Sequence, residues 1–172
     1  MALQSFHQLY TDYRKDVFSF LLRLSGYEQE LAEELTQETF YQAIRSFSKF
    51  RGECQVKTWL LQIAKNVFYQ EIRKKQRGRS LLRSILFNLE RSEPVSLHQQ
   101  VENKEKLAAV LKVLDTFDSR TRDVMLYRFY SDLSYVQISA MLKISESSAK
   151  VIFFRGKLAL QSKLREGYGY EI

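Results

Sequence analysis

Hydrophobic residues recur along the chain at the three- and four-residue spacing of amphipathic helices, and alternating strand patterns bounded by turns are missing. In the first half, this periodicity predicts helices over about residues 5–25, 28–47 and 58–75. In the second half, it predicts helices over about residues 99–114, 119–130, 134–142 and 145–164. We therefore expect an all-α protein.

Residues at the expected helix ends support these boundaries. Gly26 stands where the first helix should stop. Asp118 and Ser145 are the expected N-caps of the helices that follow them, because their side-chain oxygens can accept from free backbone N–H groups. Ser134 and Gln137 have the spacing of a capping box, so another helix should open there.

The helix over residues 28–47 should bury one apolar stripe and expose acidic residues. The stripe comprises Leu31, Leu35, Thr39 or Phe40, Ala43 and Ile44. The acidic residues are Glu28, Glu30, Glu33, Glu34 and Glu38. Acidic side chains near a helix N-terminus suit the helix dipole, which is one explanation for them. They also form a local acidic surface on a chain of net charge +7, and such a surface would repel DNA and suit a basic protein partner.

The helix over residues 58–75 has a second stripe that could bind nucleic acid. Its members are polar, cationic or aromatic: Thr58, Gln62, Lys65, Asn66, Tyr69 and Arg73. Cations neutralise phosphates, amides bond base edges, and aromatic rings stack on unpaired bases. A loop over residues 49–57 precedes the helix and contains Phe50, Arg51 and Gly52 together. The alternative is an ordinary amphipathic helix with a solvated basic side.

Residues 134–164 have the pattern of a helix-turn-helix, with a tight turn at Lys143 and Ile144. The small core between its helices should contain Ile138, Leu142, Ile144, Ala149, Phe153 and Leu160. The N-terminal half of the second helix, which enters the major groove in this motif, exposes Ser147, Ser148, Lys150, Val151, Phe154, Arg155 and Lys157. The alternative is a plain helical hairpin with a solvated basic face.

These elements suggest two small helical domains joined by a linker. We assign residues 1–78 to the first domain, 79–98 to the linker and 99–172 to the second, which holds the helix-turn-helix. The linker directly follows Gly78 and contains the only proline, Pro94, with several serines. It also contains Leu81, Leu82, Ile85, Leu86, Phe87 and Leu89, which predict a short helix that docks on a neighbour.

The composition favours some classes of partner and excludes some classes of site. The excess of Lys and Arg over Asp and Glu favours a polyanionic partner. The single Cys54 and two distant histidines, His7 and His98, cannot build a metal site, and we expect no cofactor. No apolar run approaches a membrane span and no signal peptide is evident, so we expect a cytoplasmic protein.

Two segments together resemble a known family. Residues 32–40, AEELTQETF, and residues 50–66, FRGECQVKTWLLQIAKN, are similar to the second conserved region of bacterial extracytoplasmic-function sigma factors. Residues 122–164 are similar to the fourth region of the same family. The resemblance implies a non-catalytic subunit that directs core RNA polymerase to promoters and helps to open them. It also implies an anti-sigma factor, often membrane-anchored, and no small-molecule substrate.

The resemblance implies roles for individual residues. The stretch that docks on the polymerase clamp corresponds to Glu34, Leu35, Gln37 and Glu38. The loop that receives a flipped base of the −10 element corresponds to residues 49–57, including Lys49, Phe50 and Arg51. The adjoining −10 face corresponds to Lys57, Thr58, Gln62, Lys65, Asn66, Tyr69 and Arg73. The −35 helix corresponds to Ser147, Ser148, Lys150, Val151, Phe154 and Arg155. Trp59 matches a family aromatic, and we interpret it as a core residue.

The chain departs from the family pattern at several positions. Phe117 and Asp118 stand where Leu-Pro is usual, and Glu34 stands where Asp is more common. Lys143 replaces the turn glycine, at a cost of about 1 kcal/mol if the turn is left-handed. Val151 and Ile152 replace polar or basic residues, so −35 recognition should rely on apolar contact and DNA shape.

Two other functions fit the sequence less well. A helix-turn-helix regulator with an N-terminal sensing or dimerisation domain needs neither the acidic stretch nor the KTWLLQIAKN segment. A helical enzyme using Glu34 and Glu38 as paired carboxylates lacks a nearby histidine at metal-site spacing and a nucleophile motif.

Overall fold

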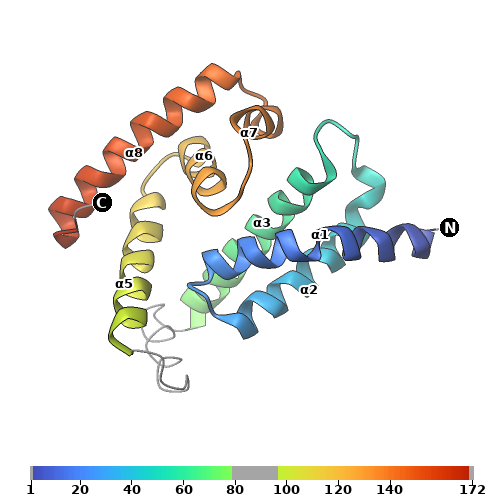
Figure 1. Ribbon diagram of the computed structural model, residues 1–172, viewed down its shortest axis with the longest axis horizontal. Coiled ribbons are helices and arrows are strands. Elements are labelled where there is room, and N and C mark those ends of the chain that lie inside the picture. Colours follow the sequence, from blue (N-terminus) through green and yellow to red (C-terminus); the bar gives the residue numbers. More distant parts are fainter. Residues whose placement is uncertain (1, 79–96, 171–172) are drawn as a thin grey trace. The chain divides into compact units, whose positions relative to one another are not determined.

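The structure, a computed structural model, describes residues 2–78 and 97–170, and every regular element in them is a helix (Figure 1). The elements are α1 (Ala2–Leu24), α2 (Gln29–Ser46), the short 3-10 helix η1 (Phe47–Lys49), α3 (Val56–Gly78), α5 (Leu97–Leu114), α6 (Ser119–Tyr130), α7 (Tyr135–Leu142) and α8 (Glu146–Tyr168). The prediction of an all-α protein is confirmed. The short helix predicted over residues 81–89 lies outside the described residues.

The chain divides into two compact units. One comprises Met1–Arg51 and Trp59–Val101, and the other comprises Gly52–Thr58 and Glu102–Ile172. The first therefore contains α1, α2 and most of α3, and the second contains most of α5 together with α6, α7 and α8.

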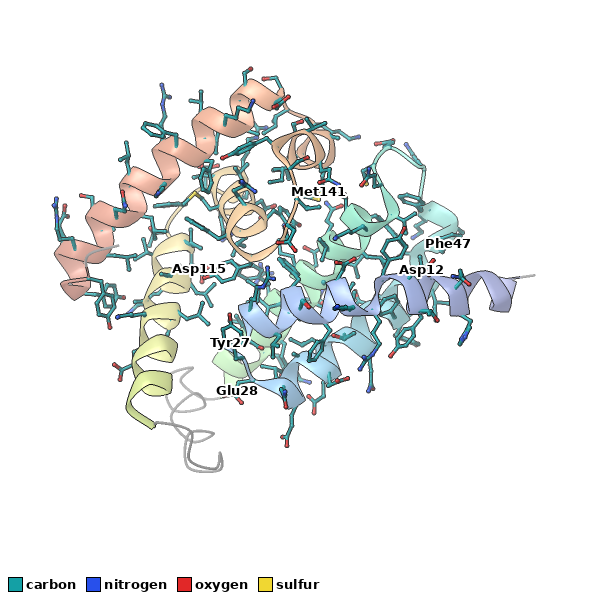
Figure 2. The ribbon with its side chains drawn as sticks, viewed as in Figure 1. Asp12, Tyr27, Glu28, Phe47, Asp115 and Met141 are labelled. Atoms are coloured by element: carbon teal, nitrogen blue, oxygen red, sulfur yellow. The ribbon has the colours of Figure 1, made fainter. Side chains whose placement is uncertain are left out.

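The end of α1 is a Schellman motif. Gly26 is left-handed at φ 72°, Tyr27 N donates to Leu22 O at 2.7 Å, and Gly26 N donates to Arg23 O at 3.4 Å. The prediction that Gly26 stops the helix is confirmed. Tyr27, labelled beside Glu28 in Figure 2, is also left-handed at φ 66°, a conformation that is uncommon for tyrosine and was not predicted.

The first unit buries one face of each of its helices. Along α1 the buried side chains are Val17, Phe20, Leu21 and Leu24; along α2 they are Ala32, Leu35, Thr36, Thr39, Phe40 and Ala43; along α3 they include Leu60, Leu61, Ala64, Val67 and Phe68. The rings of Tyr10 and Phe40 meet edge to face at 4.8 Å between α1 and α2. Near this contact, Arg14 of α1 donates from Nη2 to both carboxylate oxygens of Glu33, at 2.9 and 3.0 Å.

The expectation that Ile44 packs in the core is wrong, since its side chain is 51% exposed. The buried residues of α2 run from Ala32 to Ala43 at three- and four-residue spacing. With 3.6 residues per turn, Ile44 lies roughly 110° from the centre of that buried face. It is four residues after Phe40, which itself lies at the edge of the face, and so it points away from the core.

The second unit is built around contacts among α6, α7 and α8. Its core includes Val124, Met125, Leu126, Ile138 and Leu164. The helix α8 approaches α6 closely at Gly156, where a Cβ atom would lie 2.8 Å from Met125 Sδ and 3.2 Å from Thr121 Cγ2.

Asp118 caps α6 as predicted, and its removal should destabilise the second unit. Its carboxylate accepts from the backbone N–H groups of Arg120 and Thr121, each at 3.0 Å. Hydrogen bonds from the side chain and backbone of Thr121 hold the pKa of Asp118 below its ordinary value of 3.8. We expect Asp118→Ala to lower the free energy of unfolding by about 1 kcal/mol near neutral pH, measured by urea unfolding.

The pH dependence of this stability difference tests whether the charge of Asp118 contributes to the cap. Because the folded-state pKa of Asp118 is depressed, the charge-dependent stabilisation is present above the unfolded-state pKa and is lost as the pH falls through the folded-state value. The stability difference between wild type and Asp118→Ala should therefore narrow below about pH 4. Asp118→Asn keeps an acceptor without the charge, so it should retain most of the stability at neutral pH. A difference that stays constant with pH would contradict the role of the charge.

Candidate nucleic-acid and protein interfaces

The helix-turn-helix forms as the sequence predicts. Ser134 Oγ accepts from Gln137 N, and the Gln137 side chain accepts in return from Ser134 N at 2.8 Å, which completes the capping box. Ser145 caps α8 by accepting from Ser148 N at 3.1 Å. Lys143 is left-handed, at φ 54° and ψ 47°, so the turn does require the backbone that glycine would adopt without strain.

All seven residues predicted to contact DNA from the second helix of this motif are exposed: Ser147, Ser148, Lys150, Val151, Phe154, Arg155 and Lys157. The caps at Ser134 and Ser145 define where α7 and α8 begin. The buried residues Ala149, Gly156 and Leu160 hold the opposite face of α8 in the core. The structure therefore brings the seven residues onto the solvent side of one helix, which continues to Tyr168, beyond the predicted end.

The polar groups at the start of α8 interact with one another. Lys150 Nζ lies 2.6 Å from Glu146 Oε1 and 6.0 Å from the centre of the Tyr135 ring. The Ser145 hydroxyl lies 3.0 Å from that of Ser147 and 2.7 Å from that of Ser148. Lys150, Ser147 and Ser148 therefore already have partners within the protein at this end of α8.

The predicted −10 residues are less uniformly accessible. Lys49, Arg51, Asn66 and Arg73 are exposed, whereas Phe50, Lys57, Gln62, Lys65 and Tyr69 are half-buried. Thr58 is only 1% exposed, so its side chain is not available to DNA in this conformation, and its placement on the solvent-facing stripe was wrong. It is the third residue of α3 and lies within one turn of the buried Leu60 and Leu61.

An aromatic cluster stands at the base of the loop over residues 49–57. The Phe50 ring lies 4.9 Å from Trp59, and the Phe47 ring lies 6.0 Å from Trp59 and 6.4 Å from Phe50 (Phe47 is labelled in Figure 2). Trp59 is half-buried, so it joins the loop to α3 and is not a fully enclosed core residue. Phe47, which is 46% exposed, was not among the predicted residues; its position three residues before Phe50 was the available signal.

Only part of the predicted polymerase-binding stretch on α2 is exposed to solvent. Glu34, Gln37 and Glu38 are exposed, but Leu35 is 5% exposed and belongs to the core face of the helix. The burial of Leu35 agrees with its place in the predicted apolar stripe of this helix. Its part in the stretch that docks on the polymerase clamp stays a prediction. Glu33 is engaged by Arg14, and this hydrogen-bonded pair raises the pKa of the Arg14 guanidinium.

No helix in the described parts of the chain is long and apolar enough to cross a membrane. Among the same residues, no group of three or more His, Cys, Asp and Glu side chains could hold a metal ion.

Comparison with curated proteins gives full-length matches. The chain is 29% identical over 164 residues to the ECF RNA polymerase sigma factor SigM of Bacillus subtilis (strain 168), covering 95% of this chain and 98% of the relative. It is also 29% identical over 168 residues to SigX of the same organism, covering 94% and 84%.

Comparison with solved structures supports the same fold. The sigma factor RpoE from Bartonella quintana, solved with the anti-sigma factor NepR, matches with a TM-score of 0.54 and 22% identity, over 95% of this chain and 99% of that one. CnrH, solved with the cytosolic domain of CnrY, matches with a TM-score of 0.56 and 19% identity, over 96% and 90%.

Two family models match the chain, in the order that the resemblance implied. Sigma-70 region 2 matches residues 9–78, which contain α1 from Leu9 onward and all of α2 and α3. Sigma-70, region 4 matches residues 107–160, which contain the end of α5, all of α6 and α7, and α8 as far as Leu160. Together the matches cover more than half of the 172 residues. The chain belongs to the sigma-70 family and is an RNA polymerase sigma factor of the extracytoplasmic-function type, which directs core polymerase to promoters.

Proposed function

We propose that three surfaces of this chain divide the work of promoter recognition. The exposed acidic residues of α2 (Glu34 and Glu38, with Gln37) bind core RNA polymerase. The loop over residues 49–57 and the exposed side of α3 bind the −10 element. The N-terminal half of α8 binds the −35 element. The observation that carries the proposal is the capped helix-turn-helix, in which all seven predicted contact residues of α8 face solvent.

The domain boundaries proposed for this division are residues 1–78 and 99–172, with residues 79–98 as the tether. The match of region 2 to residues 9–78 and of region 4 to residues 107–160 supports them. Each domain would then hold one promoter element, and the tether would set how far apart the two elements lie.

Sigma factors are transcription initiation factors and are not catalysts, and we propose a non-catalytic role for this chain as well. Promoter opening needs no bond to be made or broken. A base that leaves the duplex loses stacking worth a few kcal/mol, and aromatic and polar contacts in a pocket can return a comparable amount. The Phe47, Phe50 and Trp59 cluster stands beside the loop that the family uses for this purpose.

Run-off transcription with purified bacterial core polymerase tests the function. The chain should support initiation at a defined start site on templates carrying its own promoters, and core polymerase alone should not. Absence of promoter-dependent initiation, in a preparation shown to be folded, would remove the proposal and favour the alternative of a helix-turn-helix regulator.

We also propose that an anti-sigma factor binds this chain in the cytoplasm. RpoE, a structure of the same fold, was solved with the anti-sigma factor NepR, and CnrH was solved with the cytosolic domain of CnrY. A membrane-anchored partner is compatible with this proposal. The apolar residues Leu82, Ile85 and Leu86 belong to the short docking helix that the sequence predicts, and they lie outside the described residues. We propose that they bind the anti-sigma factor or the polymerase. Their replacement by serine should weaken binding to the anti-sigma factor or to the polymerase.

Replacing both Lys65 and Arg73 of α3 by alanine should lower promoter opening and weaken its salt dependence. Each lost phosphate contact reduces the slope of log K against log salt by about 0.9. We therefore expect a slope smaller by about 2 if both side chains contact phosphates. Holoenzyme binding to a promoter duplex, measured at several salt concentrations, gives the slope, and permanganate reactivity of unpaired thymines reports opening.

A matched control removes the same charge from elsewhere. Lys15 on α1 and Lys112 on α5 are exposed and stand outside the predicted DNA surfaces. The double variant Lys15→Ala and Lys112→Ala should leave the salt slope unchanged. Equal effects of the two double variants would show that net charge, and not the α3 surface, governs binding.

A further inference from the structure

An exposed apolar pair stands on α8 where a helix-turn-helix presents side chains to base edges. Val151 is 47% exposed and Phe154 is 64% exposed. Three residues apart, they share one side of the helix. They are the sixth and ninth residues of α8, counting from Glu146, and so belong to its N-terminal half.

Three polar residues on the N-terminal side of this pair, Ser147, Ser148 and Lys150, interact within the protein. Lys150 forms an ion pair with Glu146 at 2.6 Å, so its charge is offset locally. The hydroxyls of Ser147 and Ser148 are both within hydrogen-bond distance of the Ser145 hydroxyl. The pair therefore stands out as the part of this surface whose natural partner is apolar.

The major groove offers one apolar group for such a pair, the C5-methyl group of thymine. Opposite Val151 or Phe154, the other base edges would lose water without gaining a hydrogen bond, which is unfavourable. We propose that Val151 and Phe154 read thymine methyl groups in the −35 element, a specificity that rests on the proposed binding of α8 in the major groove.

The spacing of the two side chains limits which thymines they can contact. Three residues advance about 4.5 Å along an α-helix. Base pairs follow one another at about 3.4 Å along DNA. The two side chains therefore reach neighbouring base pairs or base pairs one step further apart. The −35 element should contain two thymines, on either strand, at that separation.

Replacing thymine by deoxyuridine tests this directly, because it removes the methyl group and leaves every hydrogen-bonding group of the base in place. The probe is a promoter duplex that the holoenzyme selects from a library randomised at the −35 element. Deoxyuridine is then placed at each thymine in turn. We expect about a fourfold loss of holoenzyme affinity per methyl group at one or two neighbouring positions, and no loss elsewhere.

Variants of the chain link the methyl groups to the side chains. Val151→Ala and Phe154→Ala should each weaken binding to the thymine duplex and abolish the effect of deoxyuridine at one position. Leu158→Ala is the matched control, because Leu158 is 53% exposed on the same helix but seven residues beyond Val151. It should retain full sensitivity to deoxyuridine. All three side chains are exposed, so unfolding curves should stay close to wild type.

The outcomes separate this inference from the proposed function. A wild-type holoenzyme that selects a −35 sequence but binds the thymine and deoxyuridine duplexes equally would overturn methyl reading and leave the sigma function intact. Loss of sensitivity in Leu158→Ala but not in Val151→Ala or Phe154→Ala would also overturn it. A wild-type chain that directs no promoter binding at all would instead refute the proposed function itself.

Discussion

Replacing Glu34 and Glu38 together by lysine is expected to weaken binding of the chain to core RNA polymerase more than tenfold. The two carboxylates are exposed and stand one turn apart on the same side of α2. An exposed ion pair contributes up to about 1 kcal/mol, and reversal replaces attraction by repulsion at both positions. Fluorescence anisotropy of labelled protein titrated with core polymerase would give the affinity, and the loss should shrink at high salt.

Two comparisons isolate the effect to this surface. Glu34→Gln with Glu38→Gln removes the attraction without adding repulsion, so its loss should be smaller. Glu105→Lys with Glu166→Lys changes the net charge by the same amount on α5 and α8, where both residues are exposed. This control should bind core polymerase with nearly wild-type affinity. If it weakened binding as much as the α2 variant, the acidic surface of α2 would have no special role.

The elements whose ends depend on local chemistry were predicted well from the sequence. Asp118, Ser134 and Ser145 all cap the helices assigned to them, because an N-cap needs only a side-chain oxygen and the N–H groups two or three residues later. Gly26 ends α1 for a similarly local reason. The left-handed Tyr27 was not predictable in this way, because a tyrosine carries no preference for that conformation.

Side-chain burial was predicted less well, because it depends on which neighbouring helices cover a given face. Leu35 was correctly placed in the apolar stripe of its helix, but Thr58 was placed on a solvent-facing stripe and is buried. Ile44 was assigned to the core by its spacing from Phe40 and is exposed. A position in a motif or a helical repeat identifies a residue's neighbours along the chain. It does not show where the edge of the buried face falls.

Contacts between elements were the least accessible to sequence reasoning. Phe47, Phe50 and Trp59 meet only because η1 and the start of α3 approach each other across a loop. Gly156 matters only because α8 passes close to Met125 of α6. The spacing of Phe47 and Phe50 was a signal for the aromatic cluster, but the periodicity does not show that Trp59 meets them or that Gly156 lies at a close approach of two helices.

Replacing Gly156 by leucine should be the most destabilising of the substitutions considered, because it places a bulky side chain at the closest approach of α6 and α8. A Cβ atom alone would lie 2.8 Å from Met125 Sδ, and Met125 is fully buried, so the sulfur can move only by displacing packed neighbours. We expect the free energy of unfolding of the second unit to fall by about 3 kcal/mol. Gly156→Ala should change it much less, because a gain of about 1 kcal/mol in helix propensity opposes the clash.

Gly167, on the same helix, provides the matched control, because a Cβ atom there meets nothing within 4 Å. Gly167→Leu should leave stability unchanged or slightly higher. Urea unfolding followed by far-UV circular dichroism measures the whole chain, whereas the fluorescence of its one tryptophan, Trp59, reports the first unit and should change less.

Combining Gly156→Leu with Met125→Ala should be less destabilising than the sum of the two single changes, since leucine then fills the space left by methionine. Strict additivity, or equal stability of the Gly156→Leu and Gly167→Leu variants, would contradict a close α6–α8 contact at this residue.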